Sequence, residues 1–517
     1  MGRKPKTAAE KNGNNISESE QPTISPAGTP QLTGQYAGMF SPEDFIDDTW
    51  IGKIYGDPRK LTLTEKTYCF HNLDGKGNPV SVNDARIYKY LTHTQHIFVC
   101  GGVPYIYEGG YYHIDLKGTI ISSLISECLL EVFVKSTTIS RIFKLFLQKQ
   151  ELVKDPWDLN AHSGYYINFR NGMYDVKRRK LYPHTPKIFS INQVPWEYDP
   201  DADNGPGTEF EKYLEYAIPS EDDREMFLEY AGLCCGIDTS QQKFMLISGE
   251  GGTGKSTIIN LLQKIVGRQN ISNVPLSKLS ENFRAISMMG KLMNSCADLE
   301  IDALDDVTIV KKLVGEDSIS DSYKGKDIIS FDNYAKMLFS VNELPIVRNE
   351  KTEAFYRRLL VLTMDRKPEH PDPGLAGKLE NEIPHVIDQM MLALKRMYDR
   401  GHILVSEGSE AKTRQLRIDS DTIEAFLTEC CITGNANDKT ERKELFDKYV
   451  EYCKDWERQP HGKNSFFKAL RNKGYAETAV SGNRMFKNIR FAGTDENGFM
   501  QPTPENAEQI GDIPFDA

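Results

Sequence analysis

The segment Gly249-Glu-Gly-Gly-Thr-Gly-Lys255-Ser256 fits the pattern Gly-x-x-x-x-Gly-Lys-Ser. The apolar run Phe244-Met-Leu-Ile247 precedes it and predicts a buried strand. Thr257-Ile-Ile-Asn-Leu-Leu-Gln-Lys-Ile-Val266 follows it with the apolar spacing of a helix that packs on a sheet. Strand, glycine-rich loop and helix come in the order that a phosphate-binding loop requires, so the predicted fold class is α/β.

The chemistry of this loop predicts binding of a nucleoside triphosphate. Glycines permit backbone conformations that a side chain would forbid, so successive N–H groups can point inward at phosphate. We expect Lys255 to reach the β- and γ-phosphates and Ser256 to hold Mg²⁺, so ATP and Mg²⁺ are the predicted cofactors. A chance glycine-rich turn before a core helix is the alternative. The predicted nucleotide-binding residues are Gly249, Glu250, Gly251, Gly252, Thr253, Gly254, Lys255, Ser256 and Thr257.

A pair of carboxylates follows at the end of a second predicted strand, Lys291-Leu-Met-Asn-Ser-Cys-Ala-Asp298-Leu-Glu300. One carboxylate can hold Mg²⁺ while the other polarises a water for attack on the γ-phosphate. Asp298 joins Ser256 as a predicted metal ligand, and Asp298 and Glu300 are both predicted catalytic residues. A surface acidic run is the alternative, because further aspartates follow closely.

Two more motifs complete the predicted catalytic set, in which Lys255 is also counted. The strand Lys336-Met-Leu-Phe-Ser-Val ends at Asn342, whose amide can hold the attacking water or sense the γ-phosphate. Arg357 and Arg358 precede the strand Leu359-Leu-Val-Leu362. Arginine stabilises charge that develops on a transferring phosphoryl group, and a neighbouring subunit often supplies it.

Length and composition bound the remaining possibilities. The chain has 517 residues, enough for about three domains. Its formal charge of −11 argues against a protein coated in basic residues, and its nine cysteines include no Cys-x-x-Cys pair. The apolar stretch Ile120–Val134 is too short to span a bilayer, and no signal peptide is recognised. We therefore expect a soluble protein without a membrane partner, in the cytoplasm, with a bacterial host cytoplasm favoured.

The pattern of short strands, helices and polar segments predicts several regions. Residues 118–134 read as a helical stretch, and Tyr166–Asp175 reads as two strands joined by an Asn-Gly turn, with Asp175 a turn or surface group. The predicted organisation is a disordered tail at 1–45, an N-terminal α/β domain at 46–205, a helical lead-in at 206–238, the phosphate-loop core at 239–370, packed helices at 371–410, a winged helix at 411–492 and an acidic tail at 493–517.

The C-terminal region predicts a nucleic-acid-binding unit. Helices at Thr422–Cys431, Arg442–Trp456 and Asn464–Lys473 precede two strands around Ser481-Gly-Asn-Arg484, which is the plan of a winged helix-turn-helix. From Glu441 to Arg490 there are 12 Lys plus Arg against 7 Asp plus Glu, an electrostatic footprint for phosphate. A solvated helical surface or a protein-docking wing is the alternative. The predicted DNA contacts here are Lys463, Lys468, Arg471, Lys473 and Arg484.

These motifs in this order resemble those of superfamily 3 helicases. The chain is similar to the helicase part of phage and plasmid primase-helicases, which are related to the poxvirus primase-helicase. The segments that carry the resemblance are Gly249–Ser256, Asp298 with Glu300, Gly315-Glu-Asp-Ser-Ile-Ser-Asp-Ser-Tyr-Lys-Gly-Lys326, Asn342 and Arg357-Arg358. Asn168-Phe-Arg-Asn-Gly-Met-Tyr-Asp175 with Tyr198-Asp-Pro200 resembles the domain that precedes the motor in that family, and Ile418–Phe491 resembles its C-terminal winged-helix region.

The resemblance implies an AAA+-like ATPase core in a ring, expected to be a homo-hexamer, that hydrolyses ATP and moves 3′ to 5′ on single-stranded or forked DNA. It also implies a basic hairpin in the ring channel, matched here by Lys324 and Lys326. The poorly structured region ahead of the similarity leaves no room for a full primase domain, so primer synthesis is not expected, and a separate primase or replisome protein is a possible partner. A nucleotide-switched replication initiator or recruitment factor, with unwinding secondary, is the second hypothesis.

Overall fold

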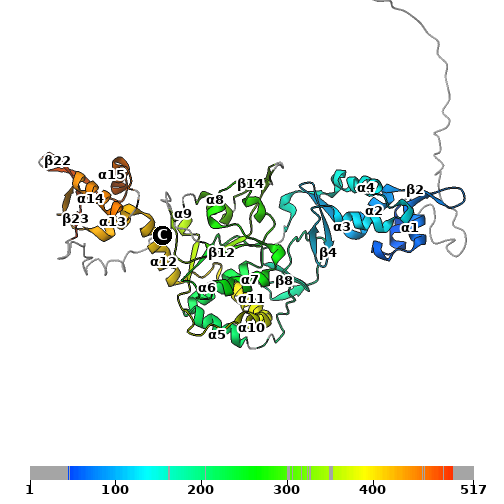
Figure 1. Ribbon diagram of the computed structural model, residues 1–517, viewed down its shortest axis with the longest axis horizontal. Helices are drawn as coiled ribbons and strands as arrows, with labels where there is room; N and C mark the ends of the chain where they lie inside the picture. Colours follow the sequence, from blue (N-terminus) through cyan, green and yellow to red (C-terminus); the bar gives the residue numbers. More distant parts are fainter. Residues whose placement is uncertain are drawn as a thin grey trace, which may run out of the picture. The chain divides into compact units, whose positions relative to one another are not determined.

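The computed structural model (Figure 1) describes residues 45, 47–160, 164–203, 205, 207–299, 303–304, 307–315, 317–322, 324, 328–347, 353–456, 458, 460–480 and 482–492. The predicted tails at 1–45, Phe45 apart, and at 493–517 lie outside these residues. Glu300 and Lys326 also lie outside them. Two compact units are present: Met1–Ile106 with Ile114–Val153, and Tyr107–His113 with Lys154–Ala517. The predicted domain boundaries stay predictions.

The first unit packs helices around aromatic side chains. Trp50 contacts Phe70 and Tyr90 with ring centroids 5.8 and 6.2 Å away, and all three are fully buried. The elements are α1 Leu63–Phe70, β1 His71–Leu73, β2 Pro79–Val82, α2 Asp84–Gln95, β3 Ile97–Cys100, α3 Thr119–Cys128 and α4 Ser136–Gln148. In the sequence, the divisions between the two units fall within three further strands, β4 Val103–Glu108, β5 Tyr111–Ile114 and β6 Val153–Lys154.

The helix expected over 118–134 is shorter in the structure. α3 ends at Cys128 because Leu129 takes an extended backbone conformation, with φ −90° and ψ 148°. A separate short turn of 3₁₀-helix covers Glu131–Phe133. The apolar residues of this stretch continue past the helix end, so the hydrophobic pattern alone overestimated its length.

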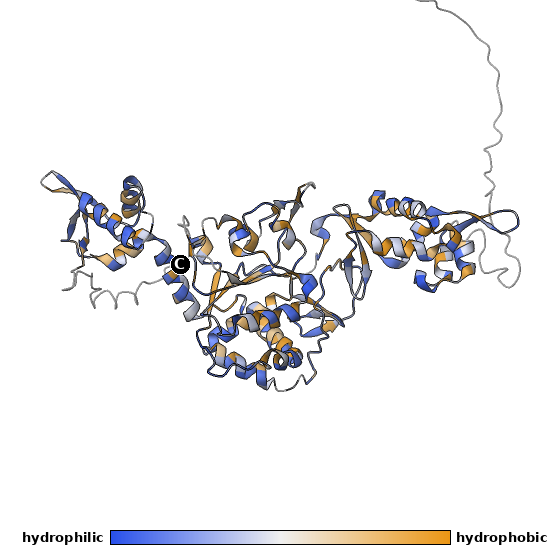
Figure 2. Ribbon diagram, viewed as in Figure 1, coloured by the Kyte–Doolittle hydropathy of each residue, from blue (hydrophilic) through white to orange (hydrophobic). Residues whose placement is uncertain are grey.

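The second unit is built on a parallel sheet with strand order β11-β12-β16-β10-β18. The predicted apolar runs are confirmed as strands, and their alternate residues point to opposite faces: Met245 and Ile247 join one core, Phe244 and Leu246 the other. Burial on both faces explains the unbroken apolar runs, visible along the strands in Figure 2. The strands are β11 Ile271–Ser272, β12 Met293–Leu299, β16 Lys336–Val341, β10 Phe244–Ser248 and β18 Leu359–Thr363.

Helices pack against both faces of this sheet. One core takes side chains from α5 Thr208–Ala217, α6 Glu221–Leu233, α7 Lys255–Val266, α10 Leu375–Asn381 and α11 Ile383–Arg400. The other takes side chains from α8 Thr308–Val314, α9 Glu353–Tyr356 and α12 Glu407–Ser420, and from a hairpin of β14 Ile319–Asp321 and β15 Ile329–Phe331. Two short strands, β13 Ala303–Leu304 and β17 Ile346–Val347, pair in parallel. The sequence had predicted α5, α6, α7 and α11, and the structure confirms them.

The predicted hairpin of Tyr166–Asp175 is confirmed. β7 Tyr166–Phe169 and β8 Gly172–Asp175 pair antiparallel, and β9 Lys180–Tyr182 extends the sheet. Asp175 is not a surface group, because its side chain is fully buried at the end of β8. Its carboxylate accepts a hydrogen bond from the backbone N–H of Arg178 at 3.0 Å, so the expected role in a turn is correct.

The C-terminal region folds around aromatic rings. Tyr449 and Phe466 stack with centroids 4.5 Å apart, and Phe426 lies 5.6 Å from Tyr449. The three predicted helices are present as α13 Thr422–Cys430, α14 Arg442–Asp455 and α15 Lys463–Asn472. The strands are β19 Cys431–Thr433, β20 Lys439–Glu441, β21 Glu477–Val480, β22 Asn483–Lys487 and β23 Ile489–Phe491, with β21 and β22 forming the predicted antiparallel pair.

Throughout the part of the chain that the structure describes, no helix combines the length and the apolar character needed to cross a membrane.

Candidate active site

The register of the parallel sheet brings three of the predicted motifs, the glycine-rich loop, the acidic strand and Asn342, to the carboxyl end of the strands. Ser248, the last residue of β10, pairs with Val341 of β16 on one side and with Thr363 of β18 on the other. Val341 in turn pairs with Leu299 of β12. The glycine-rich loop and Asn342 therefore begin at the same level of the sheet, beside the carboxyl end of β12.

The acidic strand belongs to this edge by its backbone. Asp298 lies in β12, one residue before the Leu299 that pairs with Val341. The strand is irregular between Cys296 and Leu299, where the pairing register shifts. Glu300, the second predicted carboxylate, falls outside the described residues. The structure thus brings the strand of Asp298 beside that of Asn342.

Three positions of the loop, Gly249, Gly252 and Gly254, have a positive φ that favours glycine. Gly249 has φ +151°, and a Cβ there would lie 2.0 Å from the backbone oxygen of Met364. Gly254 caps the amino end of α7 with φ +97°. Gly251 differs from the expectation, because it has no left-handed φ and a Cβ there would meet nothing within 4 Å. The tight approach of the loop to Met364, the residue after β18, therefore depends mainly on Gly249.

Lys255 is the buried centre of the site. Its side chain is only 4% exposed, and its ammonium donates to the backbone oxygens of Gly249 and Glu250, the latter at 2.9 Å. The same ammonium lies 3.3 Å from the side-chain oxygen of Asn342. Loop, α7 and the end of β16 thus meet at one cationic group. Ser256 is exposed at the start of α7, and Thr257 is half-buried.

Three residues that the sequence did not assign to the site support the loop. The Tyr213 hydroxyl donates to the backbone oxygen of Gly254 at 2.9 Å. Lys367 donates to the carboxylate of Glu250 at 2.6 Å, which lowers the pKa of Glu250, and the Tyr216 hydroxyl donates to the Lys367 backbone oxygen at 2.7 Å. The tyrosines carried only a helical packing signal, so no sequence pattern linked them to the loop.

The two arginines lie at the opposite end of the strands, the amino end. They precede β18, whose last residue, Thr363, reaches the level of the loop. Arg357 is exposed. Arg358 is half-buried and donates to the backbone oxygen of Ala354 at 2.6 Å and to the side-chain oxygen of Gln242 at 3.3 Å. Burial, and next the charge of Arg357, lower the pKa of Arg358. The structure does not bring the arginines to Lys255 of the same chain.

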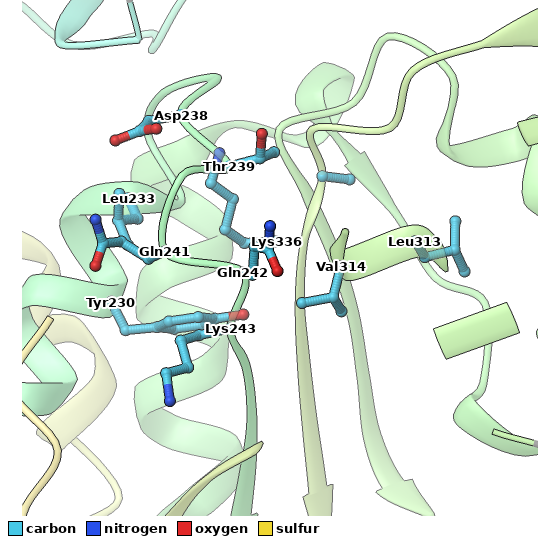
Figure 3. Close-up of a pocket in the computed structure, with 11 residues that line it drawn as sticks. Tyr230, Leu233, Asp238, Thr239, Gln241, Gln242, Lys243, Leu313, Val314 and Lys336 are labelled. Atoms are coloured by element: carbon cyan, nitrogen blue, oxygen red, sulfur yellow. The ribbon is translucent and has the colours of Figure 1, made fainter. Parts of the chain in front are cut away.

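A small pocket also lies at the amino end of the strands (Figure 3). Its lining includes Tyr230, Asp238, Gln242 and Lys243. Lys336, at the start of β16, is 5% exposed and donates to the backbone oxygens of Gly236 at 2.7 Å and Tyr334 at 3.0 Å. Burial lowers the pKa of Lys336 to about 8. This pocket is separate from the loop, because it lies at the amino end of the strands.

The predicted channel lysines fall near the β14–β15 hairpin. Ile319 pairs with Phe331 and Asp321 with Ile329, so the two strands are antiparallel and joined by the segment that contains both lysines. Lys324 is exposed in a turn of that segment. Lys326 lies outside the described residues.

The predicted DNA contacts of the C-terminal region divide into two groups. Lys468 and Arg484 are exposed. Arg471 pairs with Glu477 at 2.6 Å, and Lys473 pairs with Asp421 at 3.0 Å and also with Glu424. Burial opposes the charge of Lys473, but these carboxylates outweigh it and raise the pKa of Lys473. Lys463 is exposed, with its ammonium 5.6 Å from the ring centroid of Phe446.

Comparison with known families matches two adjoining parts of the chain. Residues 107–219 match a family described as "D5 N terminal like", and this match begins at the residue where the second compact unit begins. Residues 246–358 match a family of unknown function, DUF5906, and this range runs from β10 to Arg358.

Individual relatives are distant. The chain is 24% identical over 208 residues to "Putative helicase L207/L206" of Acanthamoeba polyphaga mimivirus, a match that covers 39% of this chain and 22% of that protein. The chain therefore spans about a fifth of that relative's length. Apo structures of the NrS-1 C terminal region are 11% and 12% identical, cover 78% of this chain and 98% of theirs, and have a TM-score of 0.46. A further structure of that region has a TM-score of 0.47. The match to the D5 N terminal like family and the similarity to the mimivirus protein relate this chain to the primase-helicase family.

Proposed function

We propose that this protein is an ATP-driven DNA helicase of the superfamily 3 type, whose subunits form a ring that moves 3′ to 5′ on single-stranded DNA during replication. The observation that carries the proposal is the meeting of Lys255 with Asn342 at the carboxyl edge of a parallel sheet. The strand of Asp298 ends beside them in register. A cation, an amide and a carboxylate are the groups that phosphoryl transfer from a nucleotide uses, and the sequence supplies one of each after or within these strands.

The residues present fit ATP and Mg²⁺. Gly249 lies close against Met364, whereas a Cβ at Gly251 or Gly252 would meet nothing within 4 Å, so a phosphate could approach the loop backbone there. The hydroxyl of Ser256 and the carboxylate of Asp298 would hold Mg²⁺, which neutralises phosphate charge when bound. Lys255 pairs with the phosphates, Asn342 orients the attacking water and Glu300 accepts its proton. The same proposal includes two assignments of domain fold: a phosphate-loop core of the AAA+ type and a C-terminal winged helix.

The arginines act on a neighbouring subunit in this proposal. β18 has five residues, so about 16 Å of strand separates its two ends at about 3.3 Å per residue. Arg357 cannot span that length to reach its own phosphate loop, and its side chain is exposed. Arg358 is held by Ala354 and Gln242. We therefore assign the trans-acting role to Arg357 and a supporting role to Arg358, which requires an oligomer such as a homo-hexamer.

ATP hydrolysis tests the site directly. Lys255→Ala should abolish hydrolysis, because it removes the cation that pairs with the phosphates. Glu300→Gln should retain ATP binding and lose hydrolysis, because an amide does not take the proton of water. Lys264→Ala, which changes an exposed lysine of the same helix, serves as the control. Hydrolysis by Lys255→Ala close to that of the unmodified protein would contradict the site.

The exposed Lys468 and Arg484 also support a second function, a nucleotide-switched initiator that binds DNA through its C-terminal region. In that case ATP would mainly change DNA affinity, and strand separation would be secondary. Measuring duplex binding and unwinding in the same preparation distinguishes the two functions, since the initiator hypothesis predicts a strong effect of ATP on binding and only weak unwinding.

A further inference from the structure

The residues immediately ahead of β10 hold the arginine pair. The ammonium of Lys243 donates to the backbone oxygen of Arg357 at 2.5 Å. The side-chain oxygen of Gln242 accepts a hydrogen bond from the guanidinium of Arg358 at 3.3 Å. The backbone N–H of Phe244, the first residue of β10, donates to the backbone oxygen of Arg358 at 2.8 Å. Three successive residues therefore each contact the arginine pair.

This segment is itself constrained. Gln242 has φ +49°, a left-handed conformation that non-glycine residues rarely adopt, and its N–H donates to the backbone oxygen of Thr239 at 2.9 Å. Lys243 is half-buried, and burial lowers its pKa. Figure 3 shows the two side chains extending in different directions from the segment. The turn thus lets adjacent residues reach different parts of the arginine pair.

The contacts leave one arginine fixed and the other available. Arg358 is bonded by Gln242 and by the backbone of α9 through Ala354. Arg357 is held only through its backbone in these contacts, at its oxygen by Lys243 and at its N–H by the oxygen of Glu353, while its side chain is exposed. A side chain that projects from a fixed peptide is preorganised for a partner's charge.

We propose that Gln242 and Lys243 are positioning residues for Arg357, and that β10 links the phosphate loop of one subunit to the site that its arginine completes in the next. This inference rests on the proposed function, because it requires Arg357 to act on a neighbour. β10 has five buried residues and is paired on both sides, so it is suited to a rigid connection between its two ends. A displacement of the phosphate loop, at the carboxyl end of β10, would then also displace Arg357, at its amino end.

Lys243→Met removes the donor to the Arg357 backbone while keeping a long side chain. It should lower DNA-stimulated ATP hydrolysis roughly ten- to a hundredfold, since a misplaced group loses most of its effect, while affinity for a fluorescent ATP analogue stays within about twofold. Lys243→Arg, which keeps a cationic donor, should restore most of the activity. The matched control is Lys291→Met, because Lys291 also precedes a strand of this sheet, donates to a backbone oxygen, that of Gln269 at 2.7 Å, and has its pKa lowered by burial.

Mixed rings separate a positioning role from a general defect. Lys243→Met subunits mixed with Lys255→Ala subunits should recover hydrolysis, because the first supply intact phosphate loops and the second supply well-placed arginines. Lys243→Met mixed with Arg357→Ala should recover none, because neither subunit supplies a well-placed arginine. Recovery in the second mixture, or its failure in the first with assembly verified by light scattering, would overturn the inference.

Gln242 gives an independent test. Gln242→Gly removes the acceptor without straining the left-handed backbone, and should lower DNA-stimulated hydrolysis, whereas Gln242→Glu keeps an acceptor and should not. If Arg357→Ala hydrolyses ATP normally, the trans-acting arginine of the proposed function fails. If Arg357→Ala is inactive while Lys243→Met and Gln242→Gly are both as active as Lys291→Met, the proposed function stands and the positioning role is wrong.

Discussion

The ammonium of Lys255 lies 3.3 Å from the side-chain oxygen of Asn342, although 87 positions separate the two residues along the chain. The contact exists because β10 and β16 are parallel neighbours whose last residues, Ser248 and Val341, are in register. A residue that follows one strand must then lie beside a residue that follows the other. The predicted catalytic roles of both residues depend on this arrangement.

Asn342 is expected to act on hydrolysis more than on binding. Asn342→Ala should leave affinity for ATP nearly unchanged, because Lys255 and the loop backbone remain. It should lower the hydrolysis rate by about a hundredfold, since the attacking water loses its orientation. Single-turnover hydrolysis and nucleotide titration measure the two effects, and Glu343→Ala, an exposed neighbour, is the control. Loss of binding with an unchanged rate per bound ATP would contradict this role.

The glycines of the loop should differ in their tolerance of a side chain. Gly249→Ala should destabilise the protein by about 1 to 3 kcal/mol, because its Cβ would lie 2.0 Å from the Met364 backbone oxygen. Gly251→Ala should be almost neutral, because a Cβ there meets nothing within 4 Å. Thermal unfolding of the two variants checks the difference, and equal melting temperatures would contradict the close packing at Gly249.

The sequence predicted the central sheet well because buried parallel strands leave a continuous apolar signal, as in Phe244–Ile247. Polar residues after those strands could be expected to meet, since parallel strands end at the same edge. The supports of the loop could not be predicted: Tyr213 reaches Gly254 from a preceding helix, and Lys367 reaches Glu250 from beyond β18. Such contacts depend on how elements pack in three dimensions, and no periodicity in the chain records them.

The sequence also could not show how the two arginines differ, or which cations of the C-terminal region are already paired with carboxylates. Arg357 and Arg358 are adjacent and chemically identical, and only the contacts of Arg358 with Gln242 and Ala354 separate them. In the same way, the carboxylate that pairs with Arg471 lies six positions away, across the turn between a helix and a strand. Charge counts treat every cation alike, whereas packing decides which ones remain available.

Exposed cations of the C-terminal region should contribute most to DNA binding. Replacing Lys468 and Arg484 by alanine should weaken binding and reduce the salt dependence of log affinity by up to about two phosphate contacts. Arg471→Ala should have a smaller effect on the salt dependence, because its guanidinium is already paired with Glu477. Fluorescence anisotropy across a salt series gives the slopes, and equal slopes for all variants would favour a protein-docking role.

Lys336 should make stability depend on pH in the alkaline range. Its pKa in the folded protein is about 8, below the usual value of 10.5, so between these values the unfolded chain binds more protons than the folded one. Stability relative to Lys336→Met should therefore rise from pH 8 to pH 10, by about 2 kcal/mol. Urea unfolding of both proteins across this range measures it. A difference that stays constant with pH would mean that Lys336 is not held in a dry environment.

Strand separation is the most direct test of the proposed helicase. A duplex with a single-stranded 3′ tail and a matched duplex with a 5′ tail should be incubated with the full chain and ATP, with Lys255→Ala as the control. The account predicts ATP-dependent separation of the 3′-tailed duplex, little separation of the 5′-tailed duplex, and none with Lys255→Ala. Binding of both duplexes without separation of either, in a preparation that hydrolyses ATP, would contradict the helicase function.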